Sequence, residues 1–192
     1  MSDSIRSHLP RCSWAERSAV EREYHDLEWG IPEHDDIRLF EWLVLEGAQA
    51  GLSWRTVLEK REGYRDAFEG FDPYRVANLD SLAEEALLRH PGIIRNRLKI
   101  RSVLNNARAF LRLQAQEGSF SEYLWAFVDG VPKRNVWPSA ADLPAQTDDS
   151  RALSLSLKAR GFSFVGPVIC YSYMQATGLV DDHIAGCFRT AR

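Results

Sequence analysis

Apolar side chains recur at helical spacing along most of this chain, and strand-like alternation is confined to short fragments such as residues 162–165. The predicted helices span residues 36–50, 54–65, 81–89, 95–116, 120–129, 150–160 and 168–177. Residues that cap helices precede several of them, as Ser53 and Ser119 do. Residues 130–149 lack periodicity and are rich in Pro, Ser, Ala and Asp, so we expect a loop or a connector between lobes. The predicted fold class is all-α.

One carboxylate interrupts the apolar pattern of the first of these helices. Glu46 shares a stripe with Leu39, Leu43 and Ala50, on the face that a helix normally buries. A buried carboxylate needs partners, because its removal from water is costly. Glu46 therefore either recognises a bound ligand or is a structural carboxylate paired with a nearby Arg or backbone group.

Aromatic residues are concentrated in the same N-terminal third of the chain. They are Trp14, Tyr24, Trp29 and Trp54. Such side chains most often fill a core or an interface. Grouped around a carboxylate, they also suit a flat cationic heterocycle, which would gain from ring stacking and from a charge partner. Both interpretations stay open on the pattern alone.

Length and composition indicate an ordinary globular protein. The 192 residues, 45% of them hydrophobic, are enough for one well-buried core or two small lobes. No apolar run reaches the roughly 18 residues of a membrane span, and the first residues lack the apolar core of a secretory signal, so we expect a cytoplasmic protein without membrane contact. Residues 1–10 are polar and are expected to form a flexible tail. Three cysteines are too few for a disulfide framework.

The net charge of −3 conceals a local excess of positive charge. Between residues 89 and 112 there are seven basic side chains and no acidic one. A mildly acidic protein with one basic stripe is predicted to have a directed anion-binding face.

A helical hairpin is predicted within this basic stretch. Ile93 and Ile94 are expected to lock the turn at Gly92, which leaves backbone N–H groups at the start of the next helix free for a phosphate. The basic side chains that add charge there are Arg95, Arg97 and Lys99. This arrangement suits a sequence-independent contact with a nucleic-acid backbone. The alternative is an ordinary helical hairpin with a solvated basic face.

Potential metal ligands lie near the two ends of the chain. Cys12 and His25 are near the start, while His183 and Cys187, four residues apart, would share one side of a helical turn. Two imidazoles and two thiolates form a closed tetrahedral zinc site, which is structural because no ligand position is left for water. The alternative is a small buried cysteine and two locally hydrogen-bonded histidines.

Taken together, these segments resemble the constitutive, type I DNA-3-methyladenine glycosylases. The matching segments are residues 11–14, 24–33, 45–54, 91–95, 160–166, 169–176 and 178–183. The likeness extends over about residues 11–187, and its motifs are long and specific.

The resemblance implies a helix-hairpin-helix DNA glycosylase fold, with one domain of two helical lobes over residues 11–192 and the hairpin at about 81–116. It implies one structural zinc ion that joins the N- and C-terminal segments. The ligands it implies are Cys12, His25, His183 and Cys187. It also implies that Leu52 is the wedge that fills the gap in the duplex, while the hairpin at Gly92 holds the DNA backbone.

The resemblance further implies a pocket for an extruded purine. Glu46 would hydrogen-bond the base, Trp54 would stack on it, and Tyr24 and Trp14 would complete the walls; Trp29 belongs to a matched segment as well. We expect a monomeric enzyme that removes 3-methyladenine from alkylated double-stranded DNA and leaves an abasic site.

Methylation places positive charge on the base and weakens its glycosidic bond, so recognition is expected to be most of the catalytic task, with the negative field of Glu46 favouring the cationic base. Residues 81–128 contain no Asp, which fits a mechanism without a dedicated strong base. A non-catalytic DNA-binding protein with the same hairpin and zinc is the alternative. A zinc hydrolase would need an open metal position, which two Cys and two His do not leave.

One position departs from the family pattern. A tyrosine is frequent three residues before Tyr24, whereas this chain has Glu21. If that position lies near the pocket or the DNA, we expect base selectivity to differ.

Overall fold

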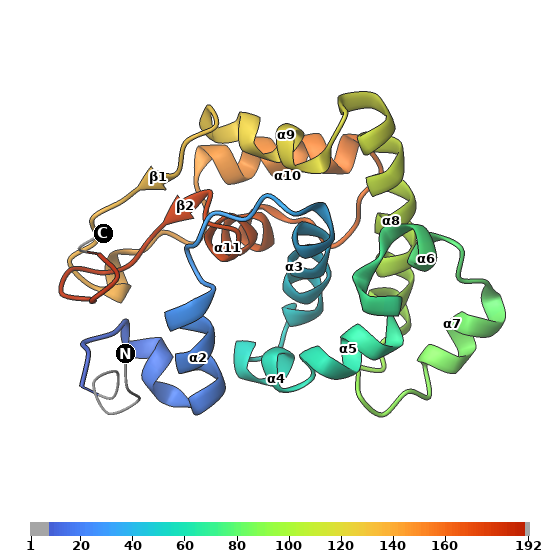
Figure 1. Cartoon of the computed structure of the whole chain (residues 1–192), viewed down its shortest axis with the longest axis horizontal. Coiled ribbons are helices and arrows are strands. Elements are labelled where there is room, and N and C mark those ends of the chain that lie inside the picture. The colour runs from blue at the N-terminus through green and yellow to red at the C-terminus, as the bar shows by residue number, and fades with distance from the viewer. Residues whose placement is uncertain (1–7, 191–192) are drawn as a thin grey trace.

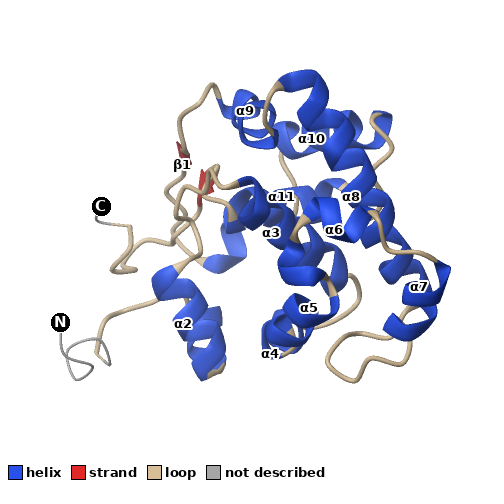
Figure 2. Ribbon diagram, turned by 45° about the vertical axis from the view of Figure 1, so that its right-hand side comes forward, coloured by secondary structure: helices blue, strands red, loops and turns tan. Residues whose placement is uncertain are grey.

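The structure, a computed structural model, describes residues 8–190 and is mostly helical (Figures 1 and 2). Residues 1–7, most of the expected tail, lie outside the described residues. The α-helices are α2 (Ala19–Leu27), α3 (Asp36–Gln49), α4 (Trp54–Glu59), α5 (Arg61–Ala67), α6 (Pro73–Ala77), α7 (Ser81–Leu87), α8 (Arg97–Glu117), α9 (Phe120–Trp125), α10 (Asp148–Ala159) and α11 (Pro167–Ala176). The 3-10 helices are η1 (Ser13–Arg17), η2 (Glu69–Phe71), η3 (Ala126–Val128) and η4 (Ala140–Asp142). The predicted helical class is confirmed, whereas the division into two lobes stays a prediction.

The strands of the described region form a single small pair. β1 (Lys133–Arg134) and β2 (Val180–Asp181) run parallel, with Lys133 opposite Val180. The strand-like fragment 162–165 is not a strand. Asn106 instead holds its backbone, since the amide side chain donates to the carbonyl of Ser163 at 2.9 Å and accepts from its N–H at 2.9 Å.

The prediction of a single helix over residues 54–65 is wrong, because the helix breaks at Lys60. That residue has φ −101° and ψ 1°, and its N–H donates to the carbonyl of Val57 in a tighter turn than an α-helix makes. The break redirects α5, so that Arg61 reaches Glu28 at 2.7 Å and Glu41 at 2.8 Å.

Helix α3 lies at the centre of the molecule (Figure 1). Helices α4, α8, α9 and α11 all contact it, and every residue from 39 to 48 is buried. Phe40 packs edge-on against Phe110 of α8 at 5.3 Å, and the hydroxyl of Tyr173 donates to the carbonyl of Leu39. A polar side chain on this helix is therefore enclosed by protein unless a cavity opens beside it.

The turn between α7 and α8 packs directly on α5 through two glycines. A Cβ atom on Gly63 would lie only 2.3 Å from the carbonyl oxygen of Gly92. Only a hydrogen atom fits there, so the two backbones can approach this closely only because both residues are glycines. Lys60, just before α5, also donates to the carbonyl of Pro91 at 3.3 Å.

Segments from the two ends of the described chain lie side by side. The N–H of Phe188 donates to the carbonyl of Pro10 at 2.8 Å, and Arg11 forms an ion pair with Asp26 at 2.8 Å. None of the helices between residues 8 and 190 has the length and apolarity that crossing a membrane requires.

Candidate base pocket and metal centre

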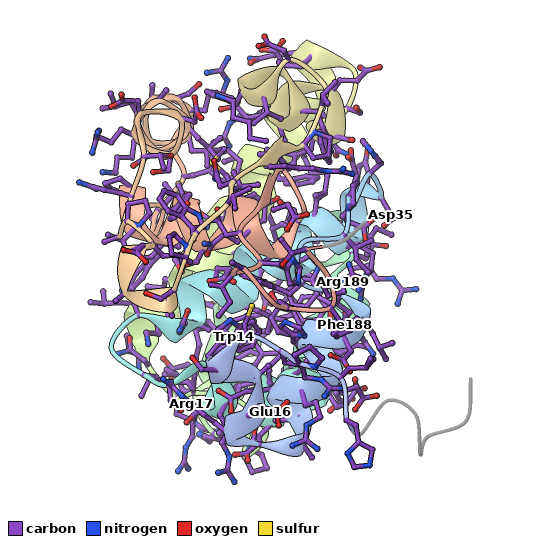
Figure 3. The ribbon with its side chains drawn as sticks, turned by 90° about the vertical axis from the view of Figure 1, so that its left-hand side faces the viewer. Trp14, Glu16, Arg17, Asp35, Phe188 and Arg189 are labelled. Carbon is purple, nitrogen blue, oxygen red and sulfur yellow. The ribbon has the colours of Figure 1, made fainter. Side chains whose placement is uncertain are left out.

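A cavity of about 380 Å³ opens beside α3, a volume within the range of small-molecule sites. It is lined by Trp14, Arg17, Glu21, Tyr24, Trp29, Glu46, Gln49, Ser53, Trp54, Leu143, Ser172 and Gln175. Glu46 and the four aromatic residues expected to contact a base are all among them. Trp14 and Arg17 of η1 lie on the face of the molecule shown in Figure 3.

Glu46 is the buried acid of this cavity. It is 3% exposed, and its Oε2 atom has no hydrogen-bond partner among the described residues. Burial raises its pKa to about 8, so in the empty cavity the carboxyl group holds its proton at neutral pH. The expected negative field of Glu46 toward a cationic base stays a prediction.

A second buried acid on the same helix shows the structural role that Glu46 does not have. Glu41 is 2% exposed and forms ion pairs with Arg38, Arg61 and Arg65 at 2.7–2.9 Å. Buried carboxylates normally have such partners. No ion pair reaches Glu46 within residues 8–190. The structural carboxylate paired with arginine that was considered for Glu46 is therefore found at Glu41.

Tilted aromatic rings form one wall of the cavity. The Tyr24 ring lies 5.3 Å from the Trp54 ring at 57° and 6.1 Å from the Trp14 ring at 50°. Trp14 in turn meets Trp29 nearly at right angles, at 5.1 Å. The Nε1 atom of Trp54 is buried without a partner in the described part of the chain. Burial, followed by the nearby charge of Glu46, raises the pKa of Tyr24 well above its usual value, so its hydroxyl stays protonated.

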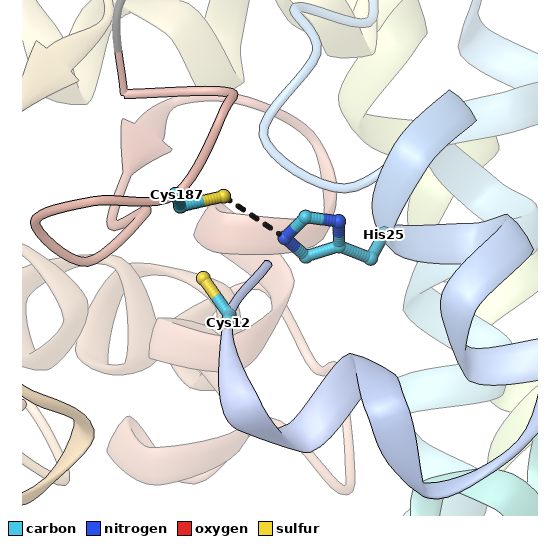
Figure 4. Close-up of side chains that lie close together, drawn as sticks. All are labelled: Cys12, His25 and Cys187. Atoms are coloured by element: carbon cyan, nitrogen blue, oxygen red, sulfur yellow. Dashed lines mark hydrogen bonds between the residues drawn. The ribbon is translucent and has the colours of Figure 1, made fainter. Parts of the chain in front are cut away.

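Three of the four expected metal ligands cluster in one place (Figure 4). The Sγ atoms of Cys12 and Cys187 and a ring nitrogen of His25 lie within 4.8 Å of one another, and all three residues are buried. The hydrogen bond between the two thiols lowers the pKa of Cys187 and raises that of Cys12. Two sulfurs and an imidazole nitrogen at this separation could hold a metal ion.

His183, the fourth expected ligand, lies beside this cluster. Its ring centroid is 5.0 Å from that of His25, and its Nε2 atom is buried without a partner among the described residues. Its Nδ1 atom is 2.7 Å from a carboxylate oxygen of Asp181. A carboxylate on one nitrogen of an imidazole leaves the other free to bind a metal, which fits a zinc ligand.

The ligand cluster also supports the wall of the cavity. Trp14 packs edge-on against the His25 ring at 5.4 Å, and Trp29 does so against the His183 ring at 4.6 Å. Both tryptophans line the cavity, so its aromatic wall rests on the potential metal ligands.

Leu52 lies at the corner between α3 and α4, next to the cavity. Its side chain is 41% exposed, and the corner is closed by the N–H of Leu52, which donates to the carbonyl of Gln49 at 2.7 Å. Gly51 takes the left-handed conformation there, with φ 75°. The corner thus presents an apolar side chain to solvent between two cavity residues, Gln49 and Ser53.

Lys99 does not lie at the surface as a DNA contact would. It is 9% exposed, and its ammonium group donates to the carbonyls of Ala48 and Ala50 at 2.8 Å and 2.7 Å. Burial lowers its pKa. The side chain therefore joins α8 to the C-terminal end of α3, just before Leu52.

The amides expected to bind a phosphate are not free at the start of α8. Helix α8 starts at Arg97, and Asn96 caps it by accepting from the N–H groups of Leu98 and Lys99. In the turn itself the N–H of Ile94 bonds the hydroxyl of Tyr64, whereas the N–H groups of Ile93 and Arg95 have no acceptor among the described residues. The Ile93 side chain is buried and locks the turn as expected, while Arg95 is exposed.

The basic stripe is less positive than the sequence indicates. Arg97 and Arg101 form ion pairs with Glu84 of α7, and Arg97 also pairs with Glu85 at 2.6 Å. Arg108 donates to the backbone carbonyls of Ala77, the last residue of α6, and of Leu79. Acids that are remote in the sequence thus neutralise part of the face.

Some cavity residues had no individual signal in the sequence. Gln175 lines the cavity, and its amide donates to Asp182 at 2.6 Å. Asp182 is 1% exposed and also accepts from Asn135 and Trp137 at 2.7 Å each. Gln175 lies within a matched segment, which was the only available indication.

A helical protein with a buried acid that has no partner among its described residues, set in an aromatic cavity, has the features of a site for a flat base. The methyladenine glycosylase family model matches residues 14–190, and the chain belongs to that family.

Named relatives agree with this assignment. The chain is 48% identical to "DNA-3-methyladenine glycosylase 1" of Escherichia coli K12, over 93% of this chain and 96% of that protein. It is 46% identical to "DNA-3-methyladenine glycosylase" of Haemophilus influenzae, over 92% and 96% respectively. The resemblance found in the sequence is confirmed.

Solved structures agree as well. A crystal structure of 3-methyladenine DNA glycosylase I superimposes with a TM-score of 0.91 at 51% identity, covering 93% of this chain and 98% of that one. The Staphylococcus aureus enzyme, described for its recognition of 3-methyladenine, gives 0.92 at 37% identity, over 96% and 98%.

Proposed function

We propose that this protein removes 3-methyladenine from alkylated double-stranded DNA by hydrolysing the N-glycosidic bond, which leaves an abasic site. The observation that carries the proposal is the buried, unpaired Glu46 in an aromatic cavity. A buried acid without a partner is costly to the protein alone, so its site suits a ligand that supplies the partner.

Recognition of the cationic base follows from the burial of Glu46. Because its pKa is about 8 in the empty cavity, the group is poised to lose its proton when a positive charge enters. The ionised carboxylate then accepts hydrogen bonds from the exocyclic amine of the base. A neutral adenine brings no charge to offset the cost of ionising the buried acid. Tyr24 and Trp54 hold the ring by stacking.

Bond cleavage then needs little acid catalysis. The C1′–N9 bond breaks with both electrons going to the base, which thereby loses its positive charge and leaves without a proton from the protein. Water adds to C1′ and releases a proton to solvent. Glu46 contributes mainly by binding and orienting the base.

For DNA binding, we propose that the free amides of Ile93 and Arg95 contact a phosphate and that the Arg95 side chain adds charge. Leu52 would enter the duplex in place of the extruded base. Lys99 would act indirectly, by fixing the end of α3 behind Leu52. The helix-hairpin-helix assignment, a monomeric state and a cytoplasmic location belong to the same proposal.

We also propose that one zinc ion is held by Cys12, His25, His183 and Cys187. The support is the compact set of two thiols and an imidazole, together with the unpartnered Nε2 atom of His183. Four protein ligands fill the tetrahedral shell, so the ion would stabilise the fold and take no part in hydrolysis.

Base release from methylated duplex DNA tests the function. We expect the wild type to release 3-methyladenine and Glu46→Gln to do so on the order of 10- to 100-fold more slowly, because a charged hydrogen-bond acceptor is lost in a buried site. Glu23→Gln, an exposed change on α2, is the control. Wild-type protein that binds methylated DNA without releasing base would instead favour the non-catalytic alternative.

A further inference from the structure

A second acid in the cavity has no part in the function proposed above. Glu21 lies in the first turn of α2 and is 5% exposed, yet it lines the same cavity as Glu46. The two acids come from different helices. A buried carboxylate in a cavity wall is costly unless something satisfies it.

The protein satisfies Glu21 only in part. Ser18 caps α2 by accepting from the N–H of Glu21 at 3.2 Å, and its hydroxyl donates to Oε2 of Glu21 at 2.7 Å. In a capping box this side chain would return to the N–H of the capping residue; here it bonds the hydroxyl instead. The Oε1 atom accepts no hydrogen bond from the residues that the structure describes.

Neither nearby arginine pairs with Glu21. Arg17 lines the cavity as well, but no ion pair joins the two side chains within the described chain. Arg55 of α4 interacts with Glu21 only at a distance, since its guanidinium bonds Glu59 at 2.7 Å. No ion pair within the described chain therefore engages the Glu21 carboxyl group beside the cavity.

We propose that Glu21 is a second carboxylate that recognises the base in this cavity and makes the site selective for positively charged alkylpurines. The inference rests on the function proposed above. It concerns a position where the sequence departs from the resembled family, since a carboxylate replaces the frequent tyrosine. An acid in place of a phenol adds a hydrogen-bond acceptor and a negative charge.

Glu21 and Glu46 then divide the recognition between them. The Glu46 carboxyl group holds its proton before the base binds, so it first presents a hydrogen-bond donor and becomes negatively charged only when it loses that proton. Glu21, with an open acceptor atom, attracts the cationic base as it enters. When the glycosidic bond breaks, the base becomes neutral and this attraction ends. Glu21 therefore strengthens substrate binding more than product binding, which predicts a higher KM and a nearly unchanged kcat when it is replaced.

The binding experiment compares two base analogues of similar shape. One is an adenine alkylated at both N3 and N9, a permanent cation that resembles the base in DNA; the other is neutral 9-methyladenine. Tryptophan fluorescence of the full chain gives a dissociation constant for each. We expect the preference for the cation to fall about five- to tenfold in Glu21→Gln, the order of magnitude for one charge–charge interaction at a hydrated site. Glu23→Gln, with the same charge change on the exposed side of α2, should keep the wild-type preference.

The excision experiment supplies the second readout. In Glu21→Gln we expect KM for methylated duplex DNA to rise by a similar factor, with kcat within about twofold of wild type. The glutamine oxygen still accepts from the hydroxyl of Ser18, and Glu21→Ala provides the same comparison should the glutamine variant unfold. An unchanged preference for the cation in both variants overturns the inference while wild-type excision stands. Wild-type protein that excises no base overturns the proposed function, and the inference with it.

Discussion

The ring of Trp29 lies 4.6 Å from the ring of His183 and at 68° to it. One tryptophan thus touches both the cavity and the potential metal ligands. Any change that displaces His183 must shift an aromatic wall of the base site as well. Stability and base binding are therefore coupled through this edge-on contact.

Metal removal provides the first prediction. We expect chelation of the protein to lower its thermal unfolding temperature and to weaken 3-methyladenine binding, because both the cluster and its neighbouring tryptophans loosen. With free zinc at about 1,000 times the dissociation constant, restoring the ion adds about 4 kcal/mol to the free energy of unfolding. Calorimetry with and without chelator, alongside metal analysis, measures this.

Two cysteine variants supply the controls for metal removal. Cys187→Ser should abolish the response to chelator. Cys170→Ser should retain it, because Cys170 is buried elsewhere and bonds the carbonyl of Val165. A carefully purified protein that contains no zinc and ignores the chelator contradicts the metal assignment.

The buried acid predicts a pH dependence of stability. The pKa of Glu46 is about 8 in the folded protein against an ordinary value of 4.5, so the folded state holds a proton that the unfolded state releases in this window. From this group alone, stability falls as pH rises from about 4.5 to about 8, by at most about 1.4 kcal/mol per pH unit. Glu46→Gln should therefore become more stable relative to wild type between pH 5 and pH 8. Denaturant unfolding at both pH values tests this; parallel curves for the two proteins would show that Glu46 is not protonated by burial.

Lys99 should act on both stability and excision. Lys99→Met leaves the carbonyls of Ala48 and Ala50 without their donor, and we expect a loss of about 1–3 kcal/mol. Excision should fall too, because the corner at Leu52 loses its anchor. Arg97→Gln is the stability control: its ion pairs are exposed, so its removal should lower the free energy of unfolding far less than the loss of Lys99. Equal losses in both variants would argue against the anchoring role.

The two facing glycines predict a link between α5 and DNA binding. Gly63→Ala places a methyl group against the carbonyl of Gly92, which must move. We expect a loss of about 1–3 kcal/mol and weaker binding of duplex DNA, since the amides of residues 93–95 shift with the turn. Gly166→Ala is the matched control, because nothing lies within 4 Å of the added atom and φ is −64°. Unchanged DNA affinity in Gly63→Ala would show that the turn tolerates the displacement.

The sequence was sufficient where local periodicity decides the structure. The spacing of Leu39 and Leu43 predicts the helix, and Glu46 on the same stripe is buried as expected, although every residue from 39 to 48 is buried as well. The capping residues Ser53 and Ser119 also mark the observed helix starts.

Long-range contacts account for what the sequence did not indicate. Burial of Lys99 depends on α8 crossing the end of α3, and pairing of Arg97 depends on α7 folding back onto α8. After the break at Lys60, Arg61 pairs with Glu28 and Glu41, which lie far away along the chain. Such contacts are set by tertiary packing, which local pattern does not encode.

The hydrogen bond between Pro10 and Phe188 has a mechanical consequence. The N- and C-terminal segments are joined there, and the proposed zinc ion would join them again through Cys12 and Cys187, so that the chain between them would form a closed loop. A force that pulls the two ends apart would act on these contacts before it reached any helix. The residues that line the base pocket lie within this loop, so such a force would not reach them until these contacts broke.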